Sequence, residues 1–276
     1  MDQFIWKLMR NKFLLALALL ISNLSTLCAK YIITADDLAS IDSKNTNIEL
    51  HKNVIIKNKD NIFYADYANI KYINFNNIAN NLKQKSFINF TKISAKGNVK
   101  IILKNSYAIA DEFIYDIPKK IMLLRSFNKN TIYKNENITL TAKKQIEYQE
   151  EDNILVARGK PKLISQNKNN INQNYTIYAD LMTAQLNSEK NNIEYAQAFD
   201  KVKFIHQNTI AKGNYALFDA KSNTILLKDN VKLQNKDSTI LACELTINID
   251  TGATDIIPCK DDTINTKIDL TSKNSN

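Results

Sequence analysis

Apolar and polar residues alternate with a period of two along most of the chain after residue 30. In the stretch from Ile93 to Leu103, every odd position is small or apolar, and the positions between include Lys96, Asn98 and Lys100. Successive side chains of a β-strand point to opposite faces, so this alternation predicts a strand with one buried face. A short break and a second stretch of this kind follow, and the two together predict a β-hairpin.

The predicted hairpin recurs along the chain, with 30 to 45 residues between equivalent alanines. In the clearer copies an aspartate follows the alanine, as at Ala35-Asp36, Ala65-Asp66, Ala110-Asp111 and Ala179-Asp180. Weaker copies centre on Ala142, Ala211 and Ala242. A second motif lies between them, at Asn53-Val54, Asn98-Val99, Lys160-Pro161, Lys201-Val202 and Asn230-Val231. About seven such units predict a continuous stacked or rolled β architecture that needs no internal domain boundary.

The apolar phase of the repeat changes at each alanine. Up to the alanine, the inward positions are the alanine itself and the residue two before it. Beyond it, they are the third, fifth and seventh residues after the alanine. Because an odd step reverses the face, we predict a bulge or bend just past the alanine, where the aspartate would bond a freed backbone N–H. Such bends would fold a long sheet over on itself. In a simpler alternative, Ala-Asp only marks the start of a strand.

The shared phase of the strands predicts one apolar interior to which many hairpins contribute. The inward residues singled out are Val54, Ile56, Val99, Ile101, Leu103, Phe113, Tyr115, Met182, Phe204, Phe218, Val231 and Leu233. Lys100 and Lys232 stand in the opposite phase and are expected outside.

Residues 1–29 differ from the rest of the chain. Basic residues precede an apolar run, Phe13–Ile21, and small or polar residues follow up to Ala29. The run is far shorter than the ~20 residues needed to span a bilayer, so the segment is predicted to be a secretory signal peptide. An uncleaved anchor and lipidation at Cys28 remain as alternatives.

Residue types suited to catalysis are sparse. The only histidines, His51 and His206, stand on predicted strands of unrelated repeats and are expected to face solvent. The sequence contains no nucleophile elbow, phosphate-binding loop or Cys-x-x-Cys motif, and its carboxylates are spread along the repeats. We therefore expect a binding or structural protein, not an enzyme, with no metal or cofactor. The net charge of +9 fits either an anionic ligand or a solvated surface that drifted basic.

The recurring motifs resemble the OstA-like family of lipopolysaccharide transport proteins. The residues that carry the resemblance are Ala35-Asp36, Asn53-Val54, Ala65-Asp66, Gly97-Asn98-Val99, Ala110-Asp111, Ala179-Asp180 and Asn230-Val231. The resemblance spans roughly residues 31 to 257, although the units at Ala142 and Ala211 lack the aspartate. It implies an all-β fold, an open V-shaped antiparallel β-jellyroll over residues 30–259, with 1–29 as signal peptide and 260–276 as a disordered polar tail.

The resemblance also implies a function. Periplasmic members of the family bind lipopolysaccharide, with its acyl chains in the jellyroll interior, and form a bridge between the inner and outer membranes that supports outer-membrane assembly. The implied partners are lipopolysaccharide, LptC-like and LptD-like proteins, and further copies of the chain, joined head to tail through edge strands such as Tyr31–Ala35 and Ala253–Ile257; nucleic acid is not among them. Two alternatives remain open: an LptC-like membrane-anchored component, or an exported β-solenoid adhesin.

Export to an oxidising compartment predicts a disulfide between Cys243 and Cys259. A three-residue loop, Asp250-Thr251-Gly252, would set Ile249 opposite Ala253 and therefore Cys243 opposite Cys259. Opposed Cβ atoms lie ~4.5–5.5 Å apart, which a small adjustment brings within disulfide range. In the alternative, Pro258 breaks the strand and leaves two unpaired thiols.

Overall fold

The computed structural model describes residues 32–42, 46–58, 61–74, 88–166, 174–187, 193–207, 209–235, 238–259 and 266–268. These residues form one twenty-stranded antiparallel sheet, and none of them is helical. The predicted all-β antiparallel fold is thus confirmed, whereas the predicted signal peptide lies outside the described residues. No helix able to cross a membrane occurs in the described ranges.

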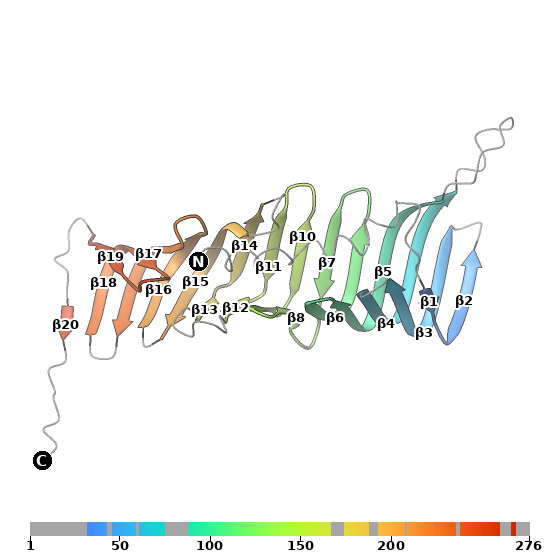
Figure 1. Cartoon of the computed structure of the whole chain (residues 1–276), viewed down its shortest axis with the longest axis horizontal. Helices are drawn as coiled ribbons and strands as arrows, with labels where there is room; N and C mark the ends of the chain where they lie inside the picture. The colour runs from blue at the N-terminus through green and yellow to red at the C-terminus, as the bar shows by residue number, and fades with distance from the viewer. Residues whose placement is uncertain are drawn as a thin grey trace, which may run out of the picture.

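Long strands build both ends of the elongated molecule (Figure 1). At one end these are β3 (Asn47–Asn58), β4 (Asn61–Asn74), β5 (Ile88–Leu103) and β6 (Ser106–Asp116), and at the other β15 (Ile193–His206), β16 (Thr209–Asp219), β17 (Thr224–Asn235) and β18 (Ser238–Asn248). Each long strand pairs with the next in sequence within its group.

The sheet divides between these ends into two rows of short strands. The last part of β6 pairs with β7, and its first part pairs with β8. The row that starts at the last part of β6 is called half-sheet I. It continues through β7 (Ile121–Arg125), β10 (Gln145–Gln149), β11 (Ile154–Arg158) and β14 (Leu181–Leu186). The row that starts at the first part of β6 is called half-sheet II. It continues through β8 (Thr131–Asn135), β9 (Ile138–Ala142), β12 (Lys162–Ser165) and β13 (Tyr175–Tyr178). Both rows rejoin at β15.

Every long strand contributes to both half-sheets, because the sheet bends across it. The bends coincide with pairs of consecutive residues in the left-handed region. These pairs are Lys52-Asn53, Gly97-Asn98, Gly159-Lys160, Asp200-Lys201 and Asp229-Asn230. Each pair immediately precedes the valine or proline of the second sequence motif. In four of the five, the ladder register shifts across the pair, and the Gly159-Lys160 pair separates β11 from β12.

The predicted position of the bulge is therefore corrected. The Ala-Asp strand does change its inward phase, but the extra residue lies on the neighbouring strand. Lys96 pairs with Glu112 and Val99 with Ala110, so Gly97 and Asn98 together oppose the single residue Asp111. Two left-handed residues turn the backbone sharply enough to bend the sheet there.

Short strands close the two ends. β1 (Ile32–Thr34) and β2 (Asp37–Asp42) both pair with β3, while β19 (Thr254–Ile257) and β20 (Thr266–Ile268) both pair with β18. The tail expected to be disordered thus includes a strand at residues 266–268, which satisfies backbone groups of β18 that β19 does not reach. The remainder of that tail lies outside the described residues.

Candidate functional site

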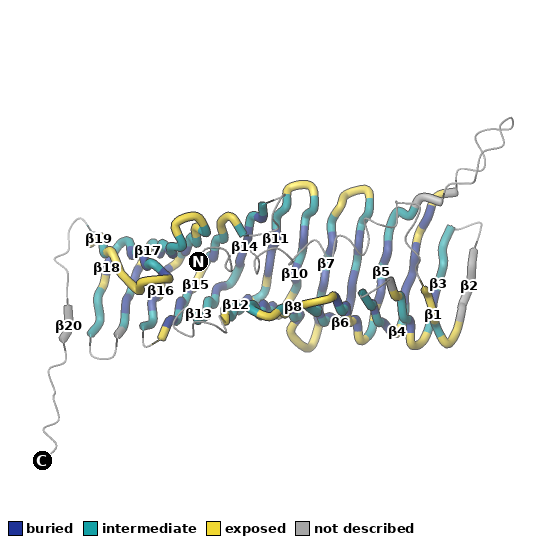
Figure 2. Tube along the Cα trace, in the orientation of Figure 1, coloured by how far each residue is buried: buried dark blue, intermediate teal, exposed yellow. Residues whose placement is uncertain are grey.

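A continuous apolar interior runs between the two half-sheets. Buried residues follow one another on the inward face of β3 through β18 and form a single hydrophobic cluster. Figure 2 shows the buried segments recurring in strand after strand along the whole length of the molecule.

All twelve residues predicted from the inward phase belong to this cluster or pack against it. Ten of them are buried, and Ile56 and Phe218 are partly buried and packed against the others. Phe63 on the half-sheet II part of β4 and Phe113 on the half-sheet I part of β6 meet edge to face across the interior, with ring centroids 5.6 Å apart. Sequence periodicity therefore places these side chains together, on one surface that spans most of the repeats.

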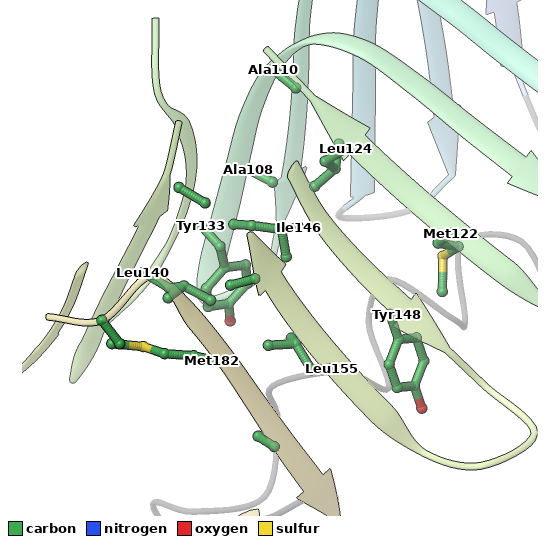
Figure 3. Packing of buried hydrophobic residues seen from close by; sticks show 14 of the residues in the cluster. Ala108, Ala110, Met122, Leu124, Tyr133, Leu140, Ile146, Tyr148, Leu155 and Met182 are labelled. Carbon is green, nitrogen blue, oxygen red and sulfur yellow. The ribbon is translucent and has the colours of Figure 1, made fainter. Parts of the chain in front are cut away.

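The middle of the interior was not singled out from the sequence. There, β7 to β11 contribute a cluster that includes Met122, Leu124, Tyr133, Leu140, Ile146, Tyr148 and Leu155 (Figure 3). The repeat motifs are weakest in this region, and its strands are only five residues long. The period-two spacing of Met122 and Leu124, and of Ile146 and Tyr148, was the sequence signal that could have identified these residues as inward.

Polar atoms enter the interior near the turn between β10 and β11. The Tyr115 hydroxyl bonds the Glu150 carboxylate, and the Tyr148 hydroxyl donates to Asn153 Oδ1 over 3.2 Å. Burial raises the pKa of Glu150 and, with the nearby Glu150 charge, the pKa values of Tyr115 and Tyr148. Hydroxyl and carboxyl groups thus border the apolar interior near this turn, an arrangement that suits an amphiphile.

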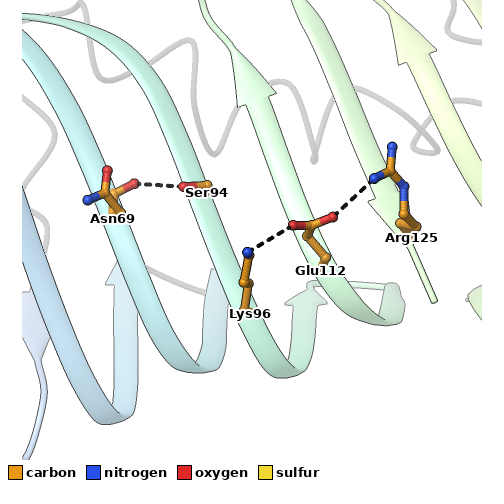
Figure 4. A network of polar contacts seen from close by, with 5 residues as sticks. All are labelled: Asn69, Ser94, Lys96, Glu112 and Arg125. Atoms are coloured by element: carbon orange, nitrogen blue, oxygen red, sulfur yellow. Dashed lines mark hydrogen bonds and ion pairs between the residues drawn. The ribbon is translucent and has the colours of Figure 1, made fainter. Parts of the chain in front are cut away.

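The outer face of half-sheet I is polar and balanced in charge. Glu112 on β6 lies between Lys96 on β5, 3.7 Å away, and Arg125 on β7, 3.4 Å away (Figure 4). On the same face, Ser94 Oγ donates to the Asn69 carbonyl over 3.5 Å. The sheet therefore separates a water-compatible exterior from an apolar interior.

The two histidines lie on opposite sides of the sheet and far apart in the sequence. His51 is partly exposed on the outer face, where its ring meets Tyr67 edge to face at 4.9 Å. His206 is buried and stacks on Phe204, so its predicted exposure is wrong: its ring fills the inward phase of β15. Throughout the described ranges, no three His, Cys, Asp or Glu side chains are grouped to hold a metal ion.

The structure contains a disulfide between Cys243 and Cys259, with Cα atoms 4.9 Å apart. The predicted register is wrong by one residue, since Ile247 pairs with Thr254 and Glu244 with Ile257. The loop is longer than predicted because Asn248 Oδ1 accepts the N–H groups of Asp250 and Thr251 and so begins the turn one residue earlier. Gly252 does take the left-handed conformation, at φ 71°.

Part of the repeat is similar to a known protein family. Residues 130–253 match the family model described as LptA/(LptD N-terminal domain) LPS transport protein. Among solved structures, the chain is similar to LptH, described as the LptA homologous periplasmic component of the lipopolysaccharide transport device of Pseudomonas aeruginosa. The identity is 14%, the TM-score is 0.40, and the match covers 48% of this chain and 94% of that one. No curated protein matches the chain. The match over residues 130–253 supports the resemblance of this repeat to the LptA and LptD N-terminal domain family of lipopolysaccharide transport proteins.

Proposed function

We propose that this protein binds the acyl chains of lipopolysaccharide between its two half-sheets and carries the lipid across the periplasm as one segment of a bridge. The observation that carries this proposal is the unbroken apolar cluster from β3 to β18. Each methylene removed from water contributes about 0.8 kcal/mol, so a lipid with several acyl chains requires a long apolar surface. A channel open along its length would leave the sugars in water.

The ends of the sheet support the second part of the proposal. Among the described residues, β1 pairs only with β3 and β19 pairs only with β18. These edges expose large apolar side chains, namely Ile32, Ile33 and Ile257, each about half exposed. Unpaired edges invite β-augmentation, so a second copy or an LptC-like or LptD-like partner would extend the sheet and continue the channel.

Photo-crosslinking tests the lipid site with matched positions on the same strands. A photoreactive amino acid would replace the inward residues Met182 or Phe113, or their outward neighbours Thr183 or Ile114. We expect lipopolysaccharide adducts at the two inward positions only, because adjacent residues of a strand face opposite sides. Equal capture at inward and outward positions would refute the interior site.

A further inference from the structure

Charge is distributed very differently over the two half-sheets. The described strand residues of half-sheet II, including the portions of the long strands beyond the bends, contain no Asp or Glu. They carry Lys57, Lys100, Lys134, Lys162, Lys203, Lys212 and Lys232. Half-sheet I mixes both signs, and its carboxylates include Glu49, Glu112, Asp116, Glu147, Glu194, Asp219, Glu244 and Asp255. The basic excess of the described strands is therefore concentrated on the outer face of half-sheet II.

The lysines nearest the C-terminal end form a row across consecutive strands. Lys162 lies opposite Tyr178, Tyr178 opposite Lys203, Lys203 opposite Lys212, and Lys212 opposite Lys232. Their inward neighbours are core residues, so the row lies on the outer face. We call these four lysines with Tyr178 the lysine row.

The lysine row is unfavourable for folding by itself. Like charges directly opposite on neighbouring strands destabilise a sheet, and strands lie only about 4.8 Å apart. None of the ion pairs between described residues includes any of the four lysines. The Tyr178 ring lies 5.3 Å from Lys162 Nζ and 5.8 Å from Lys203 Nζ, which offsets part of the repulsion. The remaining positive field faces water.

The surroundings of the lysine row indicate which anion it suits. Three of the five adjacent outward positions are apolar, namely Ile164 on β12, Ile205 on β15 and Ile210 on β16, and Thr176 and Gln234 complete that row. Further along the same face, Ile109 and Ile132 lie opposite each other. Lysines spread over several strands among isoleucines and a tyrosine match an extended anionic surface with an apolar layer beneath, as a phospholipid headgroup region provides.

We propose that the outer face of half-sheet II docks onto membrane surfaces rich in anionic phospholipids. This docking is separate from the proposed transport through the interior, because it uses the opposite side of the sheet and needs no lipopolysaccharide. It would hold the molecule against a membrane while its edge strands find their partners.

Vesicle co-sedimentation tests the proposal with the full chain and lipopolysaccharide-free vesicles. The test variant is Lys203→Gln, Lys212→Gln and Lys232→Gln. The control variant, Lys71→Gln, Lys92→Gln and Arg158→Gln, removes the same charge from the outer face of half-sheet I. For vesicles of phosphatidylglycerol and phosphatidylethanolamine, we expect partitioning to weaken on the order of 100-fold in the test variant, at about fivefold per lysine, and by less than about threefold in the control.

The N-terminal apolar run is common to all three proteins, and phosphatidylcholine vesicles report any binding that it contributes. The test variant should melt no lower than the wild type, since it removes like-charge repulsion. Equal losses in both variants would show that only net charge matters and would overturn the proposal. So would no wild-type preference for anionic vesicles, or lysine-dependent binding to soluble heparin alone, which would indicate a soluble polyanionic partner. Inward photo-crosslinking should be unaffected in the test variant, so the two proposals fail independently.

Discussion

The Asn98 side-chain amide on β5 donates a hydrogen bond of 2.9 Å to the Asp66 carboxylate on β4. Asn53 donates in the same way to Asp36 over 2.6 Å, and Lys201 Nζ lies 3.1 Å from Asp180. The aspartates of three of the four Ala-Asp dipeptides, Asp36, Asp66 and Asp180, therefore reach across to the left-handed pair of the neighbouring strand. Asp111 instead accepts the Phe127 N–H. The two sequence motifs therefore act together, because their side chains meet across neighbouring strands and stabilise the bend between the half-sheets.

Gly97→Ala should destabilise the fold by about 3 kcal/mol in urea denaturation. Gly97 has φ 73°, which costs a residue with a Cβ about 1–2 kcal/mol, and the added methyl group would overlap the Asp66 carboxylate. Gly252→Ala is the matched control, since Gly252 has φ 71° and open space around the position of a Cβ. We expect a loss of about 1 kcal/mol there. Equal losses in the two variants would show that the overlap of the added methyl group with the Asp66 carboxylate costs no stability.

Asp111→Ala should destabilise the protein by about 1–2 kcal/mol at pH 7. Asp111 accepts the Phe127 N–H over 2.8 Å and pairs with Lys129 at 2.9 Å, and these contacts lower the pKa of its carboxyl. A lowered pKa stabilises the fold above the ordinary value of 3.8, and this stabilisation is lost as the pH falls through the lowered value. The difference in thermal midpoint between wild type and variant should therefore shrink below about pH 4. A difference that is constant down to pH 2 would contradict this.

Much of the fold could be predicted from the sequence because period-two alternation and motif recurrence are local signals. They placed the inward side chains of β5, β6, β15 and β17 correctly. The position of the bulge could not be settled, because a change of phase on one strand does not reveal which partner carries the extra residue. The division of the sheet into two rows of short strands was also missed, since it depends on pairings between residues distant in sequence, such as Arg125 with Gln145.

Registers set by side-chain capping were equally hard to predict. From the sequence, Asn248 could start a turn or continue a strand. In the structure its side chain accepts hydrogen bonds from the N–H groups of Asp250 and Thr251, so the turn starts there. Likewise, only the three-dimensional pairing shows that Lys203, Lys212 and Lys232 are neighbours, because they stand on three different strands.

Charging the N-terminal edge should prevent end-to-end association while leaving the fold intact. Ile32 and Ile33 on β1 are 54% and 48% exposed, so replacing both with lysine costs little apolar burial. Lysine on an edge strand opposes pairing with another edge. In sedimentation velocity, we expect the double variant to remain monomeric at concentrations where the wild type associates.

The control for the edge variant is Tyr195→Lys. Tyr195 lies on β15, where it pairs with Gln185 of β14 on one side and Asp219 of β16 on the other, and its side chain is 45% exposed. This variant should associate like the wild type. If it lost association to the same extent as the β1 variant, added charge and not the edge would be responsible.

Removing the disulfide should loosen the C-terminal edge. Cys243 and Cys259 are 16 residues apart, and closing a loop of this size stabilises a protein by roughly 3 kcal/mol on the chain-entropy model. The double variant Cys243→Ser and Cys259→Ser should therefore unfold at a lower urea concentration than the wild type. Its amide exchange should be faster than in the wild type in β19 and unchanged in β16. A reductant should shift the wild type to the stability of the double variant and leave that variant unchanged. Reductant-insensitive wild-type stability, with two thiols that react before reduction, would mean that the bond does not form in the protein.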